Sequence, residues 1–185
     1  MHDASHDTPA IADTARWLEQ VVIGHNLCPF AQREWVRKSV RLVSAEASPP
    51  ESLIMHMLDE CAWLDEHPDT ETTLMVLEQG AEDFESYLFL VEAAEHTVAA
   101  RGYEGIYQVA SFHPEYCFAG EPPGDASNYT NRSPWPLLHL LREDSLERAL
   151  AQWESPDDIY QRNIAYTREK GAAFWQALMA GCRSR

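Results

Sequence analysis

Apolar residues recur every three or four positions near the start of the chain, as they do on one face of a helix. Thr8 and Pro9 favour a helix cap and a first turn, and Gly24 is typical of a helix end. We therefore predict a helix between these residues. Its inward face holds Ile11, Ala15, Leu18 and Val22.

The same spacing predicts further helices after Ser48, Asp83, Asp144 and Ser155, all residue types that cap helices. Ser48 and Asp144 also have a glutamate three residues later, which is the pattern of a capping box. The last helix is expected to run unbroken from residue 156 to Gly181. The predicted apolar faces are Leu53, Met57, Cys61 and Leu64; Phe84, Leu88, Val91 and Val98; and Tyr160, Ile164, Thr167, Gly171, Phe174 and Leu178.

Shorter apolar runs between these helices predict strands. One of them, Thr73–Leu77, is almost continuously apolar, which is typical of a strand covered on both faces. Strands that alternate with helices predict an α/β (or α+β) layered sandwich, with a small mixed sheet of about four strands covered by helices. Right-handed crossovers place the helices after the first two strands on one face of this sheet. The predicted strands are Lys38–Ser44, Thr73–Leu77, Gly105–Phe112 and Leu137–Leu141.

The 185 residues suit one domain. We expect residues 1–8 to form a flexible leader, residues 9–181 a single globular domain, and residues 182–185 a tail. The start of the chain lacks the features of a secretory signal, and no apolar run reaches the roughly 20 residues of a membrane helix. We therefore expect a cytoplasmic protein whose four cysteines are free thiols or metal ligands.

The charge is strongly acidic and unevenly distributed. The net charge is −16, and no lysine or arginine lies between Leu42 and Ala100. Nucleic-acid binding and polybasic membrane contacts both depend on lysine and arginine, so we expect neither. The acidic half is expected to be a solvated shell, and the alternative is a surface that docks a basic partner protein.

The segment from His113 to Pro136 differs in composition from the rest of the chain. It holds five prolines and two glycines, so it is predicted to be a long loop without a long helix or a central strand. Loops of this length in a compact domain are usually functional or disordered. Aromatic residues in and beside the segment, among them Tyr116, Tyr129 and Trp135, favour a pocket over disorder.

The polar residues of this loop suit a small anionic ligand. Arg132 offers a planar fork of donors for a carboxylate or phosphate, and Asn128, Asn131 and Asp125 can add contacts. His113 exchanges a proton near neutral pH, so we predict it to act as an acid or base. The alternative is structural: Asp125 and Asn128 form Asx turns, and Arg132 pairs with a carboxylate to fix the loop.

A second candidate is the turn from His25 to Phe30. Cys28 is a predicted nucleophile if a neighbouring cation lowers its pKa, and His25 or Arg33 can supply that cation. The alternative is that Cys28 is a small buried apolar residue and that His25 binds the last carbonyl groups of the preceding helix.

The two segments together suggest an alternative metal site. His25 with Cys28 and His113 with Cys117 supply two nitrogens and two sulfurs, which is a ligand set that tetrahedral zinc accepts, and His139 is a further candidate. Such spacings often arise by chance. We therefore expect no cofactor, with zinc or iron as the alternative.

Two unusual stretches carry a family resemblance. Asn26–Ala31 (NLCPFA) and Asn128–Pro136 (NYTNRSPWP), the latter followed by His139–Glu143, resemble the signatures of a bacterial family classed as a domain of unknown function. The resemblance covers nearly the whole chain. It implies a soluble bacterial protein without an assigned activity, and it assigns no catalytic residue.

These observations lead to one main hypothesis. We expect an enzyme that acts on a small anionic metabolite in a pocket between the 25–30 turn and the 112–136 loop, with Cys28 and His113 as catalytic residues. Arg132, Asn128, Asn131, Asp125 and His25 are the predicted substrate-binding residues. The alternatives are a ligand- or metal-binding protein without catalysis, and an acidic module that binds another protein.

Overall fold

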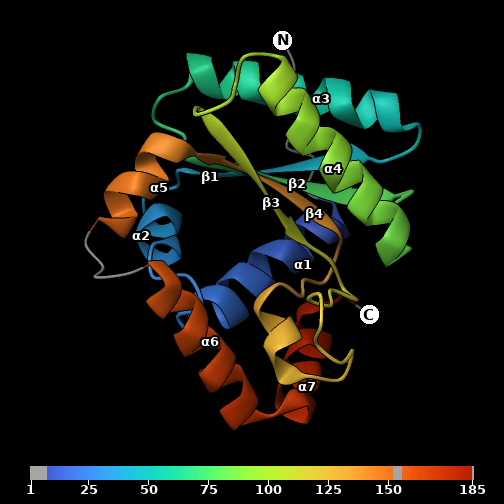
Figure 1. Ribbon diagram of the computed structural model, residues 1–185, viewed down its shortest axis with the longest axis vertical. Coiled ribbons are helices and arrows are strands. Elements are labelled where there is room, and N and C mark those ends of the chain that lie inside the picture. Colours follow the sequence, from blue (N-terminus) through green and yellow to red (C-terminus); the bar gives the residue numbers. More distant parts are fainter. Residues whose placement is uncertain (1–7, 152–155, 185) are drawn as a thin grey trace.

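The computed structural model describes residues 8–151 and 156–184 and shows a four-stranded mixed sheet between two layers of helices (Figure 1). The strand order is β1-β2-β4-β3; β1 and β2 are parallel, and β4 is antiparallel to both of its neighbours. This arrangement confirms the predicted layered α/β fold and its small mixed sheet. The strands are β1 (Val40–Glu46), β2 (Thr72–Gln79), β3 (Tyr107–Phe112) and β4 (Leu137–Arg142).

The register of the sheet places β2 and β4 at its centre. Leu74 of β2 pairs with Leu42 on one side and with His139 on the other, and His139 pairs in turn with Ala110. The first six residues of β2 are all buried, so the prediction of a strand covered on both faces is confirmed. β1 begins two residues later than predicted, because Lys38 adopts a positive φ of 57° just before it.

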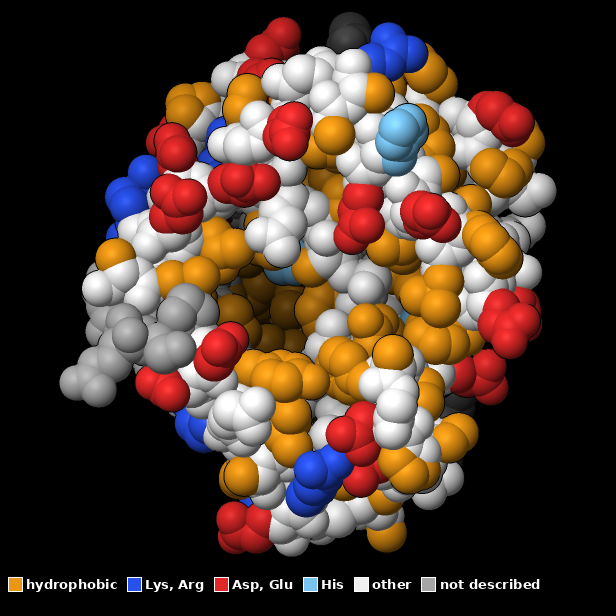
Figure 2. All heavy atoms as spheres, viewed as in Figure 1, with side chains coloured by type: hydrophobic (Ala, Val, Ile, Leu, Met, Phe, Trp, Pro, Cys, Tyr) orange, Lys and Arg blue, Asp and Glu red, His pale blue; other side chains and the backbone are white. Residues whose placement is uncertain are grey.

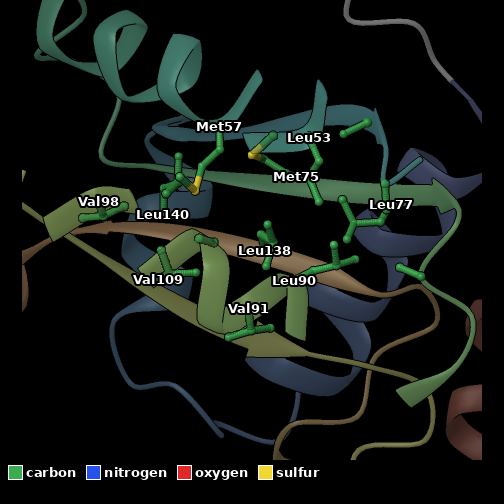
Figure 3. Close-up of a cluster of buried hydrophobic side chains, with 14 of the residues drawn as sticks. Leu53, Met57, Met75, Leu77, Leu90, Val91, Val98, Val109, Leu138 and Leu140 are labelled. Atoms are coloured by element: carbon green, nitrogen blue, oxygen red, sulfur yellow. The ribbon is translucent and has the colours of Figure 1, made fainter. Parts of the chain in front are cut away.

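One face of the sheet is covered by α3 (Pro50–Glu66) and α4 (Phe84–Ala100), the helices that follow the first two strands. Their placement on one face was predicted and is confirmed. The four apolar residues predicted for α3 are all fully buried. Met57, Leu138 and Leu140 belong to the core that results (Figure 3). In α4 the predicted face is partly wrong, because Leu88 is exposed and Tyr87 and Leu90 are buried.

The opposite face is covered by helices from both ends of the chain. Trp17, Trp175 and Leu137 meet in this second core. The Thr8 hydroxyl accepts from the backbone N–H of Ile11 and caps the first helix, as predicted, although the most buried residues, such as Trp17, lie one position before the predicted face. The covering elements are α1 (Pro9–Trp17), the π-helical turn η1 (Leu18–Ile23), α2 (Ala31–Val36), α6 (Pro156–Lys170) and α7 (Ala172–Cys182).

Two predicted helix starts are wrong in detail. Pro49, in extended conformation, precedes α3, so Ser48 is not its cap. The helix α5 (Glu143–Leu150) begins directly after β4, so Asp144 lies in its first turn and does not cap it. Ser155 lies outside the described residues.

The predicted last helix is two helices. Gly171 has φ 82° and ψ 153°, a conformation available almost only to glycine, and it separates α6 from α7. The helical spacing continues through Gly171 in the sequence, which is why the apolar pattern alone did not reveal the break.

The C-terminal segment is held against α1. Cys182 is buried as the last residue of α7, and the N–H and hydroxyl of Ser184 both donate to Asp13. Burial raises the pKa of Asp13, but the hydrogen bonds from Ser184 and Trp135 and the charge of Arg16 outweigh it and leave the pKa lowered. The chain thus remains packed beyond residue 181, where we expected the domain to end.

None of the helices within residues 8–151 and 156–184 is both long enough and apolar enough to cross a bilayer.

Candidate functional site

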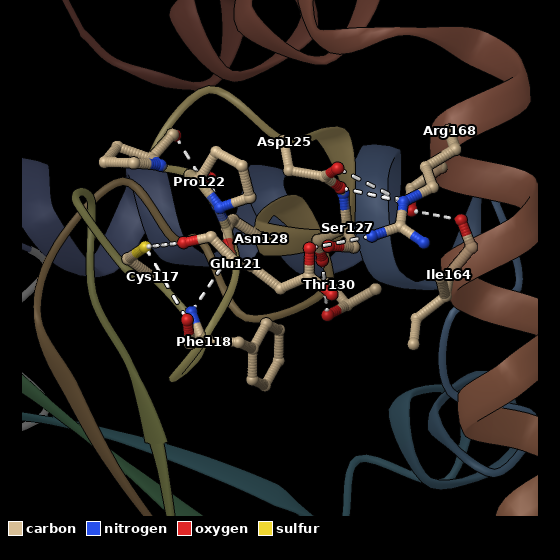
Figure 4. A network of polar contacts seen from close by, with 12 residues as sticks. Cys117, Phe118, Glu121, Pro122, Asp125, Ser127, Asn128, Thr130, Ile164 and Arg168 are labelled. Atoms are coloured by element: carbon tan, nitrogen blue, oxygen red, sulfur yellow. Dashed lines mark hydrogen bonds and ion pairs between the residues drawn. The ribbon is translucent and has the colours of Figure 1, made fainter.

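The long loop is fixed by its own polar side chains (Figure 4). Asn128 is fully buried; its Oδ1 accepts from the N–H of Phe118, and its Nδ2 donates to the carbonyl oxygen of Pro122. The loop contains a short 3-10 helix, η2 (Ala126–Thr130), capped by Asp125. Asn128 is therefore a structural residue whose amide is already committed, although it bonds Phe118 and Pro122 and does not form the expected Asx turn.

Asp125 joins the loop to α6. Its carboxylate accepts from Nε of Arg168 at 3.0 Å and from the N–H of Ser127 at 2.8 Å. These contacts, with the Arg168 hydrogen bond as the largest, lower the pKa of Asp125 to about 2. Arg168 also pairs with Glu121 at 2.8 Å. Asp125 is thus a loop anchor in this structure.

Asn131 and His113 close the base of the loop. Asn131 donates to the carbonyl oxygen of Ser111, and its own carbonyl oxygen accepts from the N–H of His113. The His113 ring is buried, with Nδ1 accepting from the N–H of Glu115 and Nε2 3.0 Å from the carbonyl oxygen of Ala81. Because Nδ1 accepts, Nε2 carries the proton. Burial lowers the pKa of His113 and favours this neutral form. Both ring nitrogens are engaged, so the geometry gives His113 no free nitrogen for proton transfer.

The 25–30 turn is held by α6. Arg162 and Asn163 donate to the carbonyl oxygens of Asn26 and Leu27, at 2.6 and 2.7 Å. Nδ1 of His25 lies 2.9 Å from the hydroxyl of Tyr166, and its ring also packs against aromatic residues of α7. Burial, followed by the charge of Lys170, lowers the pKa of His25. A neutral His25 does not supply the cation that we expected it to give Cys28.

Cys28 is half-buried at the edge of the second core. Burial raises the pKa of its thiol, and this effect outweighs the hydrogen bonds from Phe30 and Ala31 and the charge of Arg162. The thiol form therefore dominates at neutral pH, which does not favour the predicted nucleophile.

Trp135, near Arg132 in the sequence, and the 25–30 turn lie at different positions along the continuous helical rod formed by α1 and η1. Trp135, three residues from Arg132, donates to Asp13 in the middle of α1, whereas His25 follows the end of η1. At 1.5 Å per residue, the rod from Asp13 to Ile23 is about 15 Å long. The structure therefore does not bring Arg132 and Cys28 to one pocket.

The alternative metal ligands are also separated. The thiol of Cys117 donates to the carbonyl oxygen of Glu121, and Nε2 of His139 lies 2.6 Å from the hydroxyl of Thr72. Within residues 8–151 and 156–184, no three His, Cys, Asp or Glu side chains are grouped as metal ligands. The set of His25, Cys28, His113, Cys117 and His139 is not assembled in this fold.

Arg132 does line a cavity, together with a residue that the sequence did not suggest. Its Nε and Nη2 donate to the carbonyl oxygens of Tyr116 and Pro123, and its guanidinium stacks on the ring of Tyr129 at 4.6 Å. Arg183 donates through Nε to the carbonyl oxygen of Pro134. Both arginines border a depression of about 370 Å³, lined by Pro114, Tyr129, Arg132, Ser133, Pro134, Gln176, Met179, Ala180 and Arg183.

Comparison with known families identifies the chain. A family model described as "Protein of unknown function (DUF1415)" matches residues 9–177. The chain belongs to the DUF1415 family. The match confirms that the chain belongs to a family classed as a domain of unknown function, as the resemblance implied. No curated protein and no solved structure matches the chain.

No sequence signal pointed to Arg183 or Gln176. Both lie on or after α7, more than 40 residues beyond Arg132, and neither belongs to a motif. Only the packing of α7 against the loop brings them beside Arg132.

Proposed function

We propose that this DUF1415 protein binds a small anionic metabolite in the depression between the long loop and α7. The observation that carries the proposal is that two guanidinium groups, of Arg132 and Arg183, border one cavity of about 370 Å³. Guanidinium groups bind carboxylates and phosphates through paired hydrogen bonds. A volume of this size suits a metabolite of a few carbon atoms.

Both arginines are fixed in place and still have donors to offer. Each uses Nε and Nη2 on backbone carbonyl oxygens, and Nη1 of each contacts no acceptor within the described part of the chain. Donors held in position before binding cost less conformational entropy when a ligand arrives. Asp13, which accepts from the indole N–H of Trp135, is also bonded to Ser184 and Arg16.

We propose binding alone, without catalysis. The depression is bounded by different segments from those that the sequence predicted. Arg132 and the loop remain, but α7 replaces the 25–30 turn as the opposite wall. Cys28 and His113 have no part in it, because neither lines the depression and both ring nitrogens of His113 are held by backbone groups.

Titration of the ¹⁵N-labelled protein with succinate and with inorganic phosphate tests this proposal. We expect saturable chemical-shift changes at the indole N–H of Trp135, which lies beside Pro134 and Arg183. Arg183→Gln should weaken the binding at least about tenfold, since a charge-assisted hydrogen bond contributes about 1.5–3 kcal/mol. Arg183 is the better choice for substitution because Arg132 also holds the loop together.

Arg33→Gln is the matched control, because it removes the same charge from an exposed side chain on α2. It should leave both affinities unchanged. Equal weakening by Arg33→Gln and Arg183→Gln, or shifts that never saturate, would refute the proposal.

A further inference from the structure

A second hollow opens on the molecule, away from the two-arginine depression. Figure 2 shows it near the centre of the view, and comparison with Figure 1 places it between the sheet and the helices α2, α5 and α6. Its interior is apolar except for a histidine ring, and acidic side chains lie around its rim.

The alternation of side chains along the strands shows which residues of the sheet face this hollow. Leu137 of β4 belongs to the second core, so His139 and Leu141 point to the same face of the sheet. Leu137 is fully buried, whereas His139 and Leu141 remain partly exposed. Leu42 of β1 is also partly exposed on this face. Helix α1 therefore covers one end of this face and leaves the other end open.

His139 presents a hydrogen-bond acceptor at this open end. The hydroxyl of Thr72 donates to the carbonyl oxygen of Leu140, so it accepts from Nε2–H of His139 at 2.6 Å. The ring is then the neutral tautomer with an unprotonated Nδ1. Among the described residues none donates to this nitrogen. Burial lowers the pKa of His139 to about 4, which keeps the ring neutral at physiological pH.

We propose that this hollow binds a neutral small molecule that has an apolar body and one hydrogen-bond donor directed at Nδ1 of His139. The residues that face it from the sheet carry no charge, so an anion would lose its hydration without gaining a partner. A neutral ligand gains from apolar contact with Leu42, Leu141 and the adjoining ring of Phe112, whose centroid is 6.1 Å from that of His139. The inference is independent of the anion site.

Phenol and anisole form a matched pair of probes, because they have similar rings and only phenol has a donor. In calorimetric titrations we expect saturable binding of phenol that is about threefold to tenfold tighter than that of anisole, as one buried hydrogen bond allows. Leu42→Trp, which fills the hollow, should abolish the binding of both probes while the titration with inorganic phosphate is unchanged.

His139→Leu should remove the preference for phenol, and His139→Gln, which keeps an acceptor, should retain part of it. His96→Leu is the control, since His96 is exposed on α4. Circular dichroism establishes that each variant is folded. The inference is overturned if phenol does not saturate, or if the ratio of phenol to anisole affinity is the same in folded His139→Leu as in the parent.

Discussion

The two faces of the sheet differ in how completely they are covered. On the face under α3 and α4, residues such as Leu138 and Leu140 are fully buried in an apolar core (Figure 3). On the other face, His139 and Leu141 alternate with those residues on the same strand and remain partly exposed. Alternate residues of β4 therefore face a closed apolar core on one side of the sheet and a partly open surface on the other.

The two faces therefore contribute differently: one provides most of the closed apolar core, and the other holds the candidate binding sites. Burial of the apolar core on the closed face contributes to folding, and the charged side chains on this face, Arg41 and Glu60, are already bonded to each other. Both candidate sites lie on the side of the sheet that α1, α6 and α7 cover, where helices from the two ends of the chain leave hollows. The open face retains its hollows at the expense of buried apolar area.

The largest expected effect on stability comes from a comparison of two adjacent leucines of β4, Leu140 and Leu141. Leu140→Ala leaves a cavity in the closed core and should lower the free energy of unfolding by about 2–5 kcal/mol. Leu141→Ala should cost about 1 kcal/mol, because its side chain is already partly in water. Urea denaturation measures both. Equal losses would show that the two faces do not differ as described.

The second prediction concerns pH. The pKa of His139 is about 4 in the folded state against 6.5 ordinarily, so the unfolded state binds more protons between these values. Stability is therefore full above pH 6.5 and decreases as the pH falls towards 4, by up to about 3 kcal/mol from this group. His25 and His113, whose pKa values are also lowered, add to the decrease in the same direction.

Urea denaturation at several pH values checks this assignment. His139→Leu should reduce the loss of stability between pH 6.5 and 4, whereas His96→Leu should not, because His96 is exposed. The same pH dependence in the parent and in His139→Leu would contradict a ring that is held neutral at this position.

The third prediction concerns the break between α6 and α7. Gly171→Ala should destabilise the protein by about 1–3 kcal/mol, because alanine is strained at a φ of 82° even though no atom lies within 4 Å of the added Cβ. Gly181→Ala is the control, since Gly181 lies within α7 with open space around it. It should be neutral or stabilise by less than about 1 kcal/mol. Thermal unfolding that ranks the two variants in the opposite order would contradict the break.

The smallest effect is expected at the exposed pair that joins the loop to α6. Arg168→Gln should raise the pKa of Asp125 from about 2 towards its ordinary value of 3.8. The stabilisation by this carboxylate is present above the ordinary pKa and is lost as the pH falls towards 2. Carboxyl NMR titration measures the pKa. Arg148→Gln, which removes an exposed arginine from α5, should leave it unchanged.

Much of the fold could be predicted because local patterns agree with it. The continuous apolar run of β2 and the helical spacing of Leu53, Met57 and Cys61 reflect the burial that the layered fold requires of these elements. The break at Gly171 could not be predicted, because both helices on either side keep a helical pattern and only the backbone conformation differs.

The candidate sites were predicted only in part. Arg132 and the loop around it were found because prolines, aromatics and polar residues are concentrated there. Residue types, however, do not show which donors the backbone already occupies. His113 and Asn128 have the composition of site residues, yet both are used to hold the loop.

By itself the sequence determined the layered fold, the family, the acidic charge and the location of the unusual loop, because each depends on composition or on local periodicity. The tertiary structure alone decided which side chains meet across distances in the chain. It placed Arg183 beside Arg132, separated Cys28 from both, and left His139 at an open end of the sheet. Such contacts depend on how helices from the two ends of the chain pack together, which no local pattern encodes.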